Sequence, residues 1–118
     1  AACTCTEYAI ARRTQTEMRR KFEHFFTNYD LLLLPTTPIP APPIDGMNAV
    51  DEARRLTRFT SPFNLTGLPA LSLPCGFTVD GLPIGLQIIS PHWGEIKLFQ
   101  AGQAYEGATG WSAFAINL

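Results

Sequence analysis

The 118-residue sequence predicts an α/β fold, in which a partial mixed β-sheet with a β-hairpin is flanked by helices. Two observations carry this prediction. Asp80-Gly81 stands between two apolar segments, as is typical of a hairpin turn, and apolar residues recur at spacings of three and four near both ends of the chain. The length accommodates one domain, residues 1–118, with a core of its own.

The first predicted helix begins at a capping box and runs to about Asn28. Thr4 is followed three residues later by Glu7, so each side chain can bond to the other's backbone N–H. The helix then carries one regular stripe of residues, which we expect to be its buried face. The stripe consists of Tyr8, Ala11, Gln15, Met18, Phe22, Phe25 and Tyr29.

A strand is predicted at Leu31–Leu34. Four consecutive leucines are typical of a strand buried on both faces. The strand stops at Pro35, the first of five prolines between residues 35 and 43, which favour an extended connection that cannot continue a sheet.

Three further helical segments are predicted. One begins at Asn48 and ends at about Phe59. A short one has Ser61-Pro62 as its N-cap and first helical residue and closes at Gly67. The last follows Trp93-Gly94-Glu95 to about Glu106. Its predicted buried stripe is Leu98, Ala101, Gly102 and Tyr105.

The hairpin spans the two apolar segments on either side of Asp80-Gly81. We expect a two-residue type I′ turn, because Asp and Gly tolerate positive φ best. This turn sets a register with one wholly apolar, buried face, in which Phe77 faces Ile84. In the same register Gly76 faces Gly85, and we expect Gly102 of the last helix to pack onto this pair. Pro74 and Pro83 then occupy positions that are not hydrogen-bonded to the partner strand.

Composition excludes several classes of function. A net charge of −1 argues against a nucleic-acid partner, and the absence of a long apolar run argues against a membrane span or partner. Three cysteines form no disulfide framework, which favours a cytoplasmic setting. The sequence has no phosphate-binding loop, dinucleotide fingerprint or spaced metal-ligand pairs, so we expect no cofactor and no metal.

Three segments together resemble the C-terminal portion of the amidase signature family. They are Asp30–Pro38, Phe59–Gly76 and Gly81–Ile89. The resemblance implies a hydrolase of carboxamide C–N bonds that uses a lysine and two serines. In the family the nucleophilic serine lies in a Gly-Gly-Ser-Ser-Gly type of stretch upstream of the portion resembled here.

That catalytic set has no counterpart in this sequence. The chain contains no Ser-Ser dipeptide, and its only lysines, Lys21 and Lys97, do not match the context of the catalytic lysine. We therefore predict no catalytic residue here, and a fragment that is inactive alone.

The resemblance suggests three residues that face a substrate pocket. Thr57 matches the position at which relatives that act on glutamine amides supply an acidic residue, so a glutamine amide is not supported as substrate. Thr60 and Asn64 match the segment that follows. Either residue can equally be a hydrogen-bonding residue of a helix terminus.

Several partners are compatible with such a fragment. A missing N-terminal amidase portion or a separate chain would complete the site, and a small amide is a substrate only of the completed enzyme. Open strand edges also favour a homo-oligomer. The alternative function is a non-catalytic binding or oligomerisation module derived from the same fold.

Overall fold

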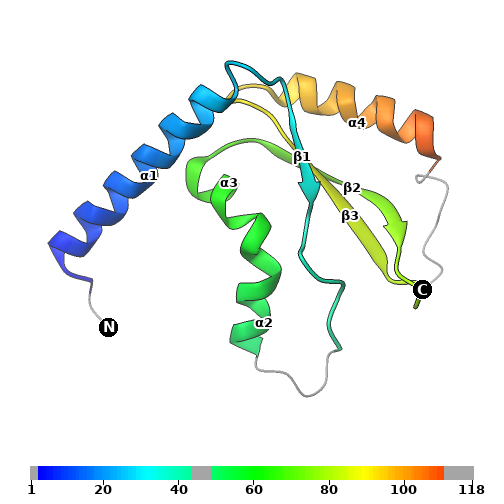
Figure 1. Ribbon diagram of the computed structural model, residues 1–118, viewed down its shortest axis with the longest axis horizontal. Coiled ribbons are helices and arrows are strands. Elements are labelled where there is room, and N and C mark those ends of the chain that lie inside the picture. Colours follow the sequence, from blue (N-terminus) through cyan, green and yellow to red (C-terminus); the bar gives the residue numbers. More distant parts are fainter. Residues whose placement is uncertain (1–2, 44–48, 111–118) are drawn as a thin grey trace.

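The computed structural model describes residues 3–43 and 49–110 and confirms the α/β fold (Figure 1). Within these ranges three strands form one antiparallel sheet in the order β1-β3-β2, with helices around it. The elements are α1 (Cys5–Phe25), β1 (Leu32–Pro35), α2 (Ala49–Leu56), the 3₁₀ turn η1 (Thr57–Phe59), α3 (Ser61–Thr66), β2 (Ala70–Phe77), β3 (Pro83–Ile89) and α4 (Glu95–Thr109).

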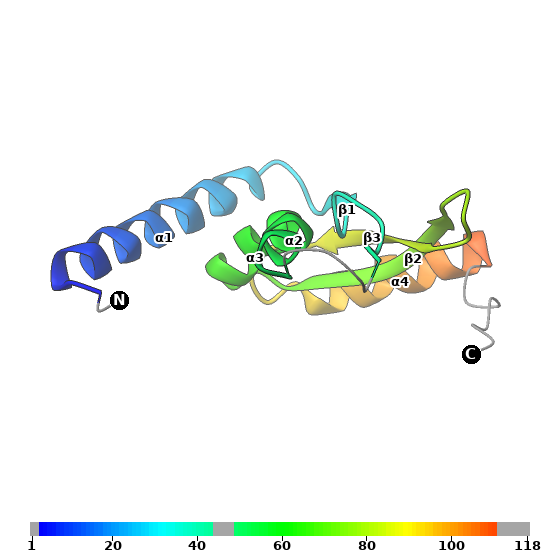
Figure 2. The same cartoon turned by 90° about the horizontal axis from the view of Figure 1, so that it is seen from below.

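The sheet has a packed layer on each face. On one face the fully buried Ile89 packs with Phe63 and Leu68. Four half-buried side chains complete this cluster: Phe22, Phe26, Leu32 and Leu34. The other face is covered by α4, which runs along β2 and β3 (Figure 2). Ile88 points to this second face, because successive strand residues alternate between faces.

The capping box predicted at the start of α1 is confirmed. The Thr4 hydroxyl accepts the Glu7 N–H at 3.2 Å, and the Glu7 carboxylate accepts the Thr4 N–H at 2.8 Å. Hydrogen bonds from Thr4 lower the pKa of Glu7, because they stabilise its charged form.

The predicted buried face of α1 is correct only in the second half of the helix. The helix ends at Phe25, three residues before the predicted end, and extends away from the sheet as an arm (Figure 1). Gln15, Met18, Phe22 and Phe25 are half-buried, whereas Tyr8, Ala11 and Tyr29 are exposed. The reason is that α3 packs only against the second half.

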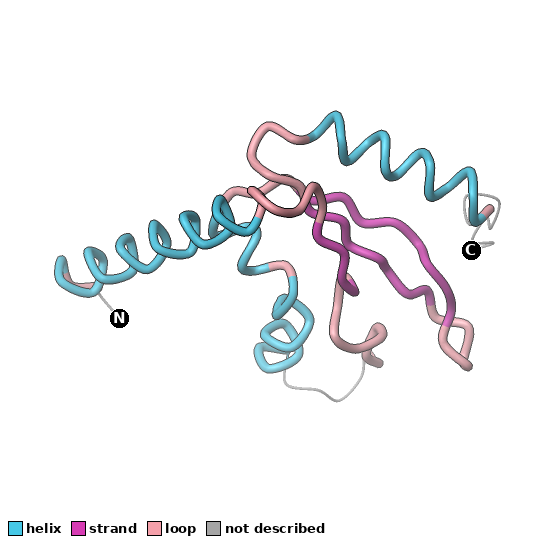
Figure 3. The backbone as a smooth tube through the Cα atoms, turned by 45° about the horizontal axis from the view of Figure 1, so that its top comes forward, coloured by secondary structure: helices cyan, strands magenta, loops and turns pink. Residues whose placement is uncertain are grey.

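The leucine strand begins one residue later than predicted and is less deeply buried. It forms β1, an edge strand in the described sheet, and Leu33 is 55% exposed. Leu32 and Leu34 do join the core on the opposite face. Leu33 stays exposed because α4 lies over β2 and β3. Figure 3 shows that the chain leaves β1 as a loop, as the prolines predict.

The second helical segment ends where the sequence predicts. The 3₁₀ turn η1 extends α2 to Phe59. The predicted cap, Asn48, lies outside the described residues. In α3 the N-cap is Thr60 rather than Ser61, and the carbonyl of Thr60 accepts the N–H groups of the third and fourth helical residues. Gly67 ends α3 with a φ of 73°, as predicted.

The buried stripe predicted for the last helix is confirmed. In α4 Leu98 and Gly102 are buried, while Ala101 and Tyr105 are half-buried. The helix continues three residues beyond the predicted end and stops before Gly110, which has a φ of 66°.

The hairpin turn lies where predicted, but its type is different. The Gly81 N–H donates to the Thr78 carbonyl at 3.0 Å, and the Thr78 N–H donates to the Leu82 carbonyl at 2.8 Å. The loop therefore has three residues, with Gly81 at a φ of 81° and Asp80 at a negative φ. A type I turn followed by a left-handed glycine also matches the twist of the two strands.

The predicted register is consequently wrong. The longer loop shifts the pairing by one residue, and a bulge at Cys75 shifts it again. Pro74 and Pro83 nevertheless occupy positions that are not hydrogen-bonded to the partner strand, as predicted. The observed pairs are Phe77 with Pro83, Gly76 with Ile84, Pro74 with Gly85 and Leu73 with Leu86.

The new register separates the two glycines and changes what each contacts. A Cβ at Gly102 would lie 2.7 Å from Leu71 Cδ2, so α4 packs on leucines of β2 and the predicted packing on Gly76 and Gly85 is wrong. The predicted burial of one whole apolar face is also wrong, since Val79 is fully exposed and Phe77 is 42% exposed.

Candidate functional site

The three predicted pocket residues lie close together in sequence and structure. Thr57 begins η1, Thr60 caps α3 and Asn64 lies in α3. The Thr57 hydroxyl donates to the Ala53 carbonyl at 2.8 Å, and the Thr60 hydroxyl donates to the Thr57 carbonyl at 3.3 Å. Both threonine hydroxyls thus bond within their own helical segment, while Asn64 is exposed. A role in substrate binding remains a prediction for all three.

Gln87 of the central strand fixes this turn to the sheet. Its side chain is buried, and Nε2 donates to the Phe59 carbonyl at 3.2 Å. The bond joins β3 to the end of η1, one residue before Thr60. The sequence places Gln87 on the less apolar face of the hairpin, but nothing in the sequence indicates that it bonds to Phe59.

A hydroxyl pair holds the proline segment against the hairpin. Thr36 Oγ1 lies 2.7 Å from Ser72 Oγ, and the Thr36 N–H donates to the Gly85 carbonyl at 2.8 Å. A Cβ on Gly85 would lie 2.7 Å from Thr36 Oγ1. Glycine at this position therefore allows the chain that follows β1 to approach β3 closely.

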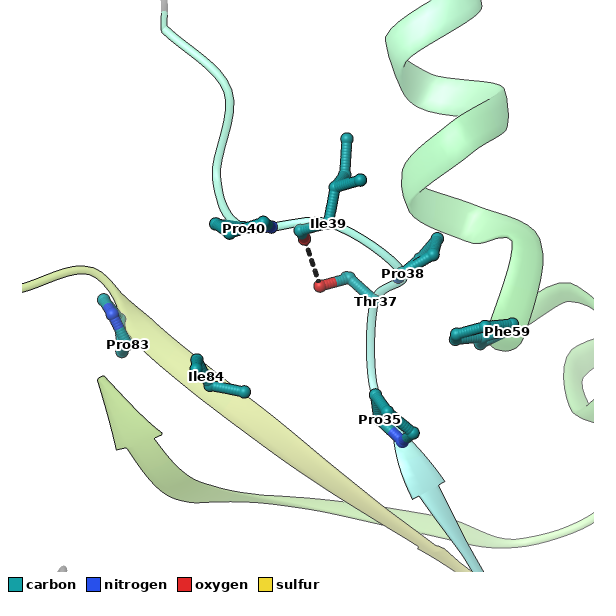
Figure 4. A pocket seen from close by; sticks show the side chains of 8 residues that line it. All are labelled: Pro35, Thr37, Pro38, Ile39, Pro40, Phe59, Pro83 and Ile84. Carbon is teal, nitrogen blue, oxygen red and sulfur yellow. Dashed lines mark hydrogen bonds between the residues drawn. The ribbon is translucent and has the colours of Figure 1, made fainter. Parts of the chain in front are cut away.

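Beside this junction lies a cavity of about 270 Å³ (Figure 4). It is lined by Pro35, Thr37, Pro38, Ile39, Pro40, Phe59, Pro83 and Ile84. Prolines have no N–H, and the Thr37 hydroxyl already donates to the Ile39 carbonyl at 2.8 Å. The walls therefore suit an apolar group and supply few hydrogen-bond donors.

Three described side chains of the types used in acyl transfer bond to other groups. Such a reaction needs a nucleophile within hydrogen-bond reach of a base. Ser72 is paired with the Thr36 hydroxyl, and the fully buried Ser90 donates to the Pro91 carbonyl at 3.1 Å. Lys97 pairs with Asp30 at 2.6 Å.

Ion pairs among the described residues are exposed, except that the buried carboxylate of Glu52 pairs with Arg55 at 3.0 Å. Lys97 lowers the pKa of Asp30 through a hydrogen bond and its positive charge. In residues 3–43 and 49–110 no three His, Cys, Asp or Glu side chains gather closely enough to hold a metal ion. None of the helices in these ranges combines the length and the apolar character that crossing a bilayer requires.

Comparison with known sequences gives a consistent result. A family model described as Amidase matches residues 2–99. The chain is 45% identical over 107 residues to a glutamyl-tRNA(Gln) amidotransferase subunit of Shouchella clausii, and 43% identical over 101 residues to the protein of the same name from Halothermothrix orenii. The matches cover 89% and 86% of this chain but 22% and 21% of the relatives. The chain thus spans about one fifth of their length.

Solved structures agree with the sequence comparison. A 6-aminohexanoate cyclic dimer hydrolase matches 97% of this chain with a TM-score of 0.79 and 31% identity, while the match covers 26% of the hydrolase. A bacterial aryl acylamidase of the amidase signature family matches 93% of the chain with a TM-score of 0.72 and 26% identity, over 24% of that enzyme.

Proposed function

Because the chain belongs to the amidase family, we propose that it forms the C-terminal part of an amidase-like hydrolase of carboxamide C–N bonds. The observation that carries this proposal is the match of nearly the whole chain to one quarter of a hydrolase. The catalytic serines and lysine would belong to the remaining three quarters, so this chain alone would be inactive.

In the completed enzyme, this chain would supply part of the substrate-cavity wall. Thr57, Thr60 and Asn64 lie on one short segment, and Gln87 fixes that segment to the central strand. The family resemblance implies an acidic residue at the position of Thr57 in relatives acting on glutamine amides, so the threonine here favours a small amide without the amino group of glutamine. The free thiols of Cys3, Cys5 and Cys75 support a cytoplasmic location.

The proposal is tested by completing the fold. In the 6-aminohexanoate cyclic dimer hydrolase, the segment that this chain matches is replaced by this chain, and hydrolysis of simple amides is measured. We expect the chimera to hydrolyse amides, whereas the isolated chain does so no faster than buffer. The hydrolase lacking this segment is the control. Saturable turnover by the isolated chain that survives repurification and is lost in Ser61→Ala or Ser72→Ala would overturn the proposal.

The pocket residues are tested in the same chimera. Thr57→Ala and Asn64→Ala are expected to change KM or kcat for an amide by about tenfold, the effect of roughly 1.4 kcal/mol. Thr16→Ala is the matched control for Thr57, because the Thr16 hydroxyl also donates to a carbonyl four residues earlier but lies on the exposed arm of α1. Kinetics that stay unchanged in all three variants would exclude Thr57 and Asn64 from the substrate cavity.

The anchoring role of Gln87 gives a separate prediction. Gln87→Met keeps the side-chain volume but removes the donor to the Phe59 carbonyl, so we expect a loss of about 1 kcal/mol in the free energy of unfolding. Hydrogen exchange at the η1 amides should become faster. Gln15→Met is the control, because the half-buried Gln15 side chain also donates to a backbone carbonyl, that of Leu65, at 2.6 Å. Equal effects of the two variants would contradict a special role for Gln87.

The second candidate function is a non-catalytic binding or oligomerisation module. Exposed apolar side chains on described elements favour it, among them Ile96 at 73% and Phe99 at 67% exposure. A chimera that folds with the parent's stability but hydrolyses no amide would favour this second function.

A further inference from the structure

The whole chain exposes more surface than a compact globular monomer of its mass. Its 118 residues expose 8817 Å², whereas a globular monomer of 13.0 kDa exposes about 6300 Å². Its radius of gyration is 17.2 Å, compared with about 13.5 Å for a compact domain of this length. Among the described residues only five apolar side chains are buried: Phe63, Leu68, Ile88, Ile89 and Leu98. Much of its apolar surface therefore lacks a partner within these ranges.

The two outer edges of the described sheet are poor sites for adding a strand. In an antiparallel pair, every second residue of a strand directs its backbone N–H and C=O groups at the neighbouring strand. Thr36 does so toward β3, because its N–H donates to the Gly85 carbonyl. The preceding residue, Pro35, therefore directs its backbone away from β3, toward the open edge. On the other edge, the Ser90 N–H donates to the Pro69 carbonyl, so Pro69 and every second residue after it face β3. Pro74 is five residues further along β2 and therefore directs its backbone toward the open edge. A proline has no N–H to offer a new strand. A partner is therefore more readily accommodated on an apolar surface than along these edges.

One apolar surface of this kind is a groove beside the start of β3. One wall is the segment Pro35–Pro43 and the other is Leu82–Ile84, with Phe59 at one end; we call it the proline groove. It contains the 270 Å³ cavity and a second cavity of about 620 Å³, which share Pro40. Figure 4 shows Pro83 and Ile84 across the cavity from the proline segment.

The composition of the groove favours contact with protein side chains. Its lining is apolar except for Thr37, whose hydroxyl bonds to Ile39, and Asp80 at the far end. Leu82 and Ile84 are each 38% exposed, so they can still lose considerable area to a partner. A partner with apolar side chains would gain free energy from burying these two side chains.

Area distinguishes between two possible occupants. A standard interface between two proteins buries about 800 Å² on each partner. The excess exposed area of this chain is about 2500 Å², so a second copy would cover only about one third of it. The matching hydrolase contains almost three times as much additional chain as this chain contributes, since the match covers 26% of it. An occupant of that size can cover the excess.

We propose that the proline groove is a docking surface for apolar side chains from the remaining three quarters of the amidase fold. This inference rests on the proposed function, for which it names a specific contact. Through this groove, the extended segment after β1 and the start of β3 would pack against the catalytic part. The contact would lie beside η1, whose Phe59 lines the groove.

The test compares groove variants in two contexts. Leu82→Asp and Ile39→Asp are made in the isolated chain and in the hydrolase chimera, and thermal unfolding midpoints are measured. We expect both variants to lower the midpoint of the chimera by about 5 °C or more, because a charge would be buried against the partner. In the isolated chain, where Leu82 is 38% exposed and Ile39 is half-buried, the shift should be clearly smaller than in the chimera. Ile96→Asp, at an exposed position on α4, is the matched control and is expected to have the smaller effect in the chimera.

The outcomes separate this inference from the proposed function. An inactive but folded chimera that still shows the context-dependent shift supports the groove and rejects the enzymatic proposal. Equal shifts in both contexts, or no shift in either, would overturn the groove. Light scattering of the isolated chain adds a second check: a dimer that Leu82→Asp dissociates would identify a second copy as the occupant and would also overturn the proposal.

Discussion

Ile89→Ala is expected to lower the free energy of unfolding by about 2–5 kcal/mol. Ile89 is fully buried on the central strand and packs with Phe63 and Leu68. Shortening it to alanine removes buried apolar area and leaves a cavity that the surrounding strands cannot fill completely. Because only five apolar side chains are buried in the described chain, the loss is a large share of a typical total stability. Urea unfolding followed by circular dichroism measures the effect.

Ile96→Ala is the matched control for this core variant. It makes the same substitution at a side chain that is 73% exposed on α4, and the expected change is within about 0.5 kcal/mol. If the two alanine variants unfold at the same urea concentration, the cluster around Ile89 does not hold the chain together.

Gly85→Val is expected to destabilise the chain by about 1–3 kcal/mol. A Cβ at this position would lie 2.7 Å from Thr36 Oγ1, 3.1 Å from Thr36 Cβ and 3.2 Å from Ser72 Oγ. Thr36 cannot move away easily, because its own N–H donates to the Gly85 carbonyl. The valine should therefore displace the segment after β1 and break the hydrogen bond between Thr36 and Ser72. Chemical denaturation measures the loss.

Gly76→Val provides a control in the same hairpin. No atom lies within 4 Å of a Cβ built at Gly76, so valine should cost little and can add stability through its strand propensity. The sequence-based register has the two glycines facing each other, which predicts similar effects for both variants. Finding that similarity experimentally would contradict the observed register and the contact between Gly85 and Thr36.

The two hairpin variants illustrate why the predicted register is incorrect. Asp80-Gly81 correctly locates the turn, but it is compatible with both a two-residue and a three-residue loop. The bulge at Cys75 lies between Pro74 and Gly76, residue types that occur at bulges without requiring one, and each added residue moves every subsequent pair. Local sequence therefore predicts the existence of the hairpin, while its pairing depends on contacts with β1 and the segment that follows it.

The candidate site shows a similar division. The resemblance to amidases correctly places the chain in its family, and it groups Thr57, Thr60 and Asn64 on one segment. The anchor from Gln87 and the proline groove could not be predicted, since each joins residues that are far apart in sequence. Such contacts depend on how the strands and the proline segment fold against one another.

Short-range interactions set several features that the sequence predicts correctly. The capping box at Thr4 and Glu7, the glycine that ends α3 and the buried stripe of α4 each follow from neighbouring residues and helical periodicity. Which apolar residues are covered, by contrast, depends on how the elements pack together. Leu33 remains exposed and Ile89 is fully buried, although both lie in apolar strands, because burial depends on whether another element packs over that face of the sheet.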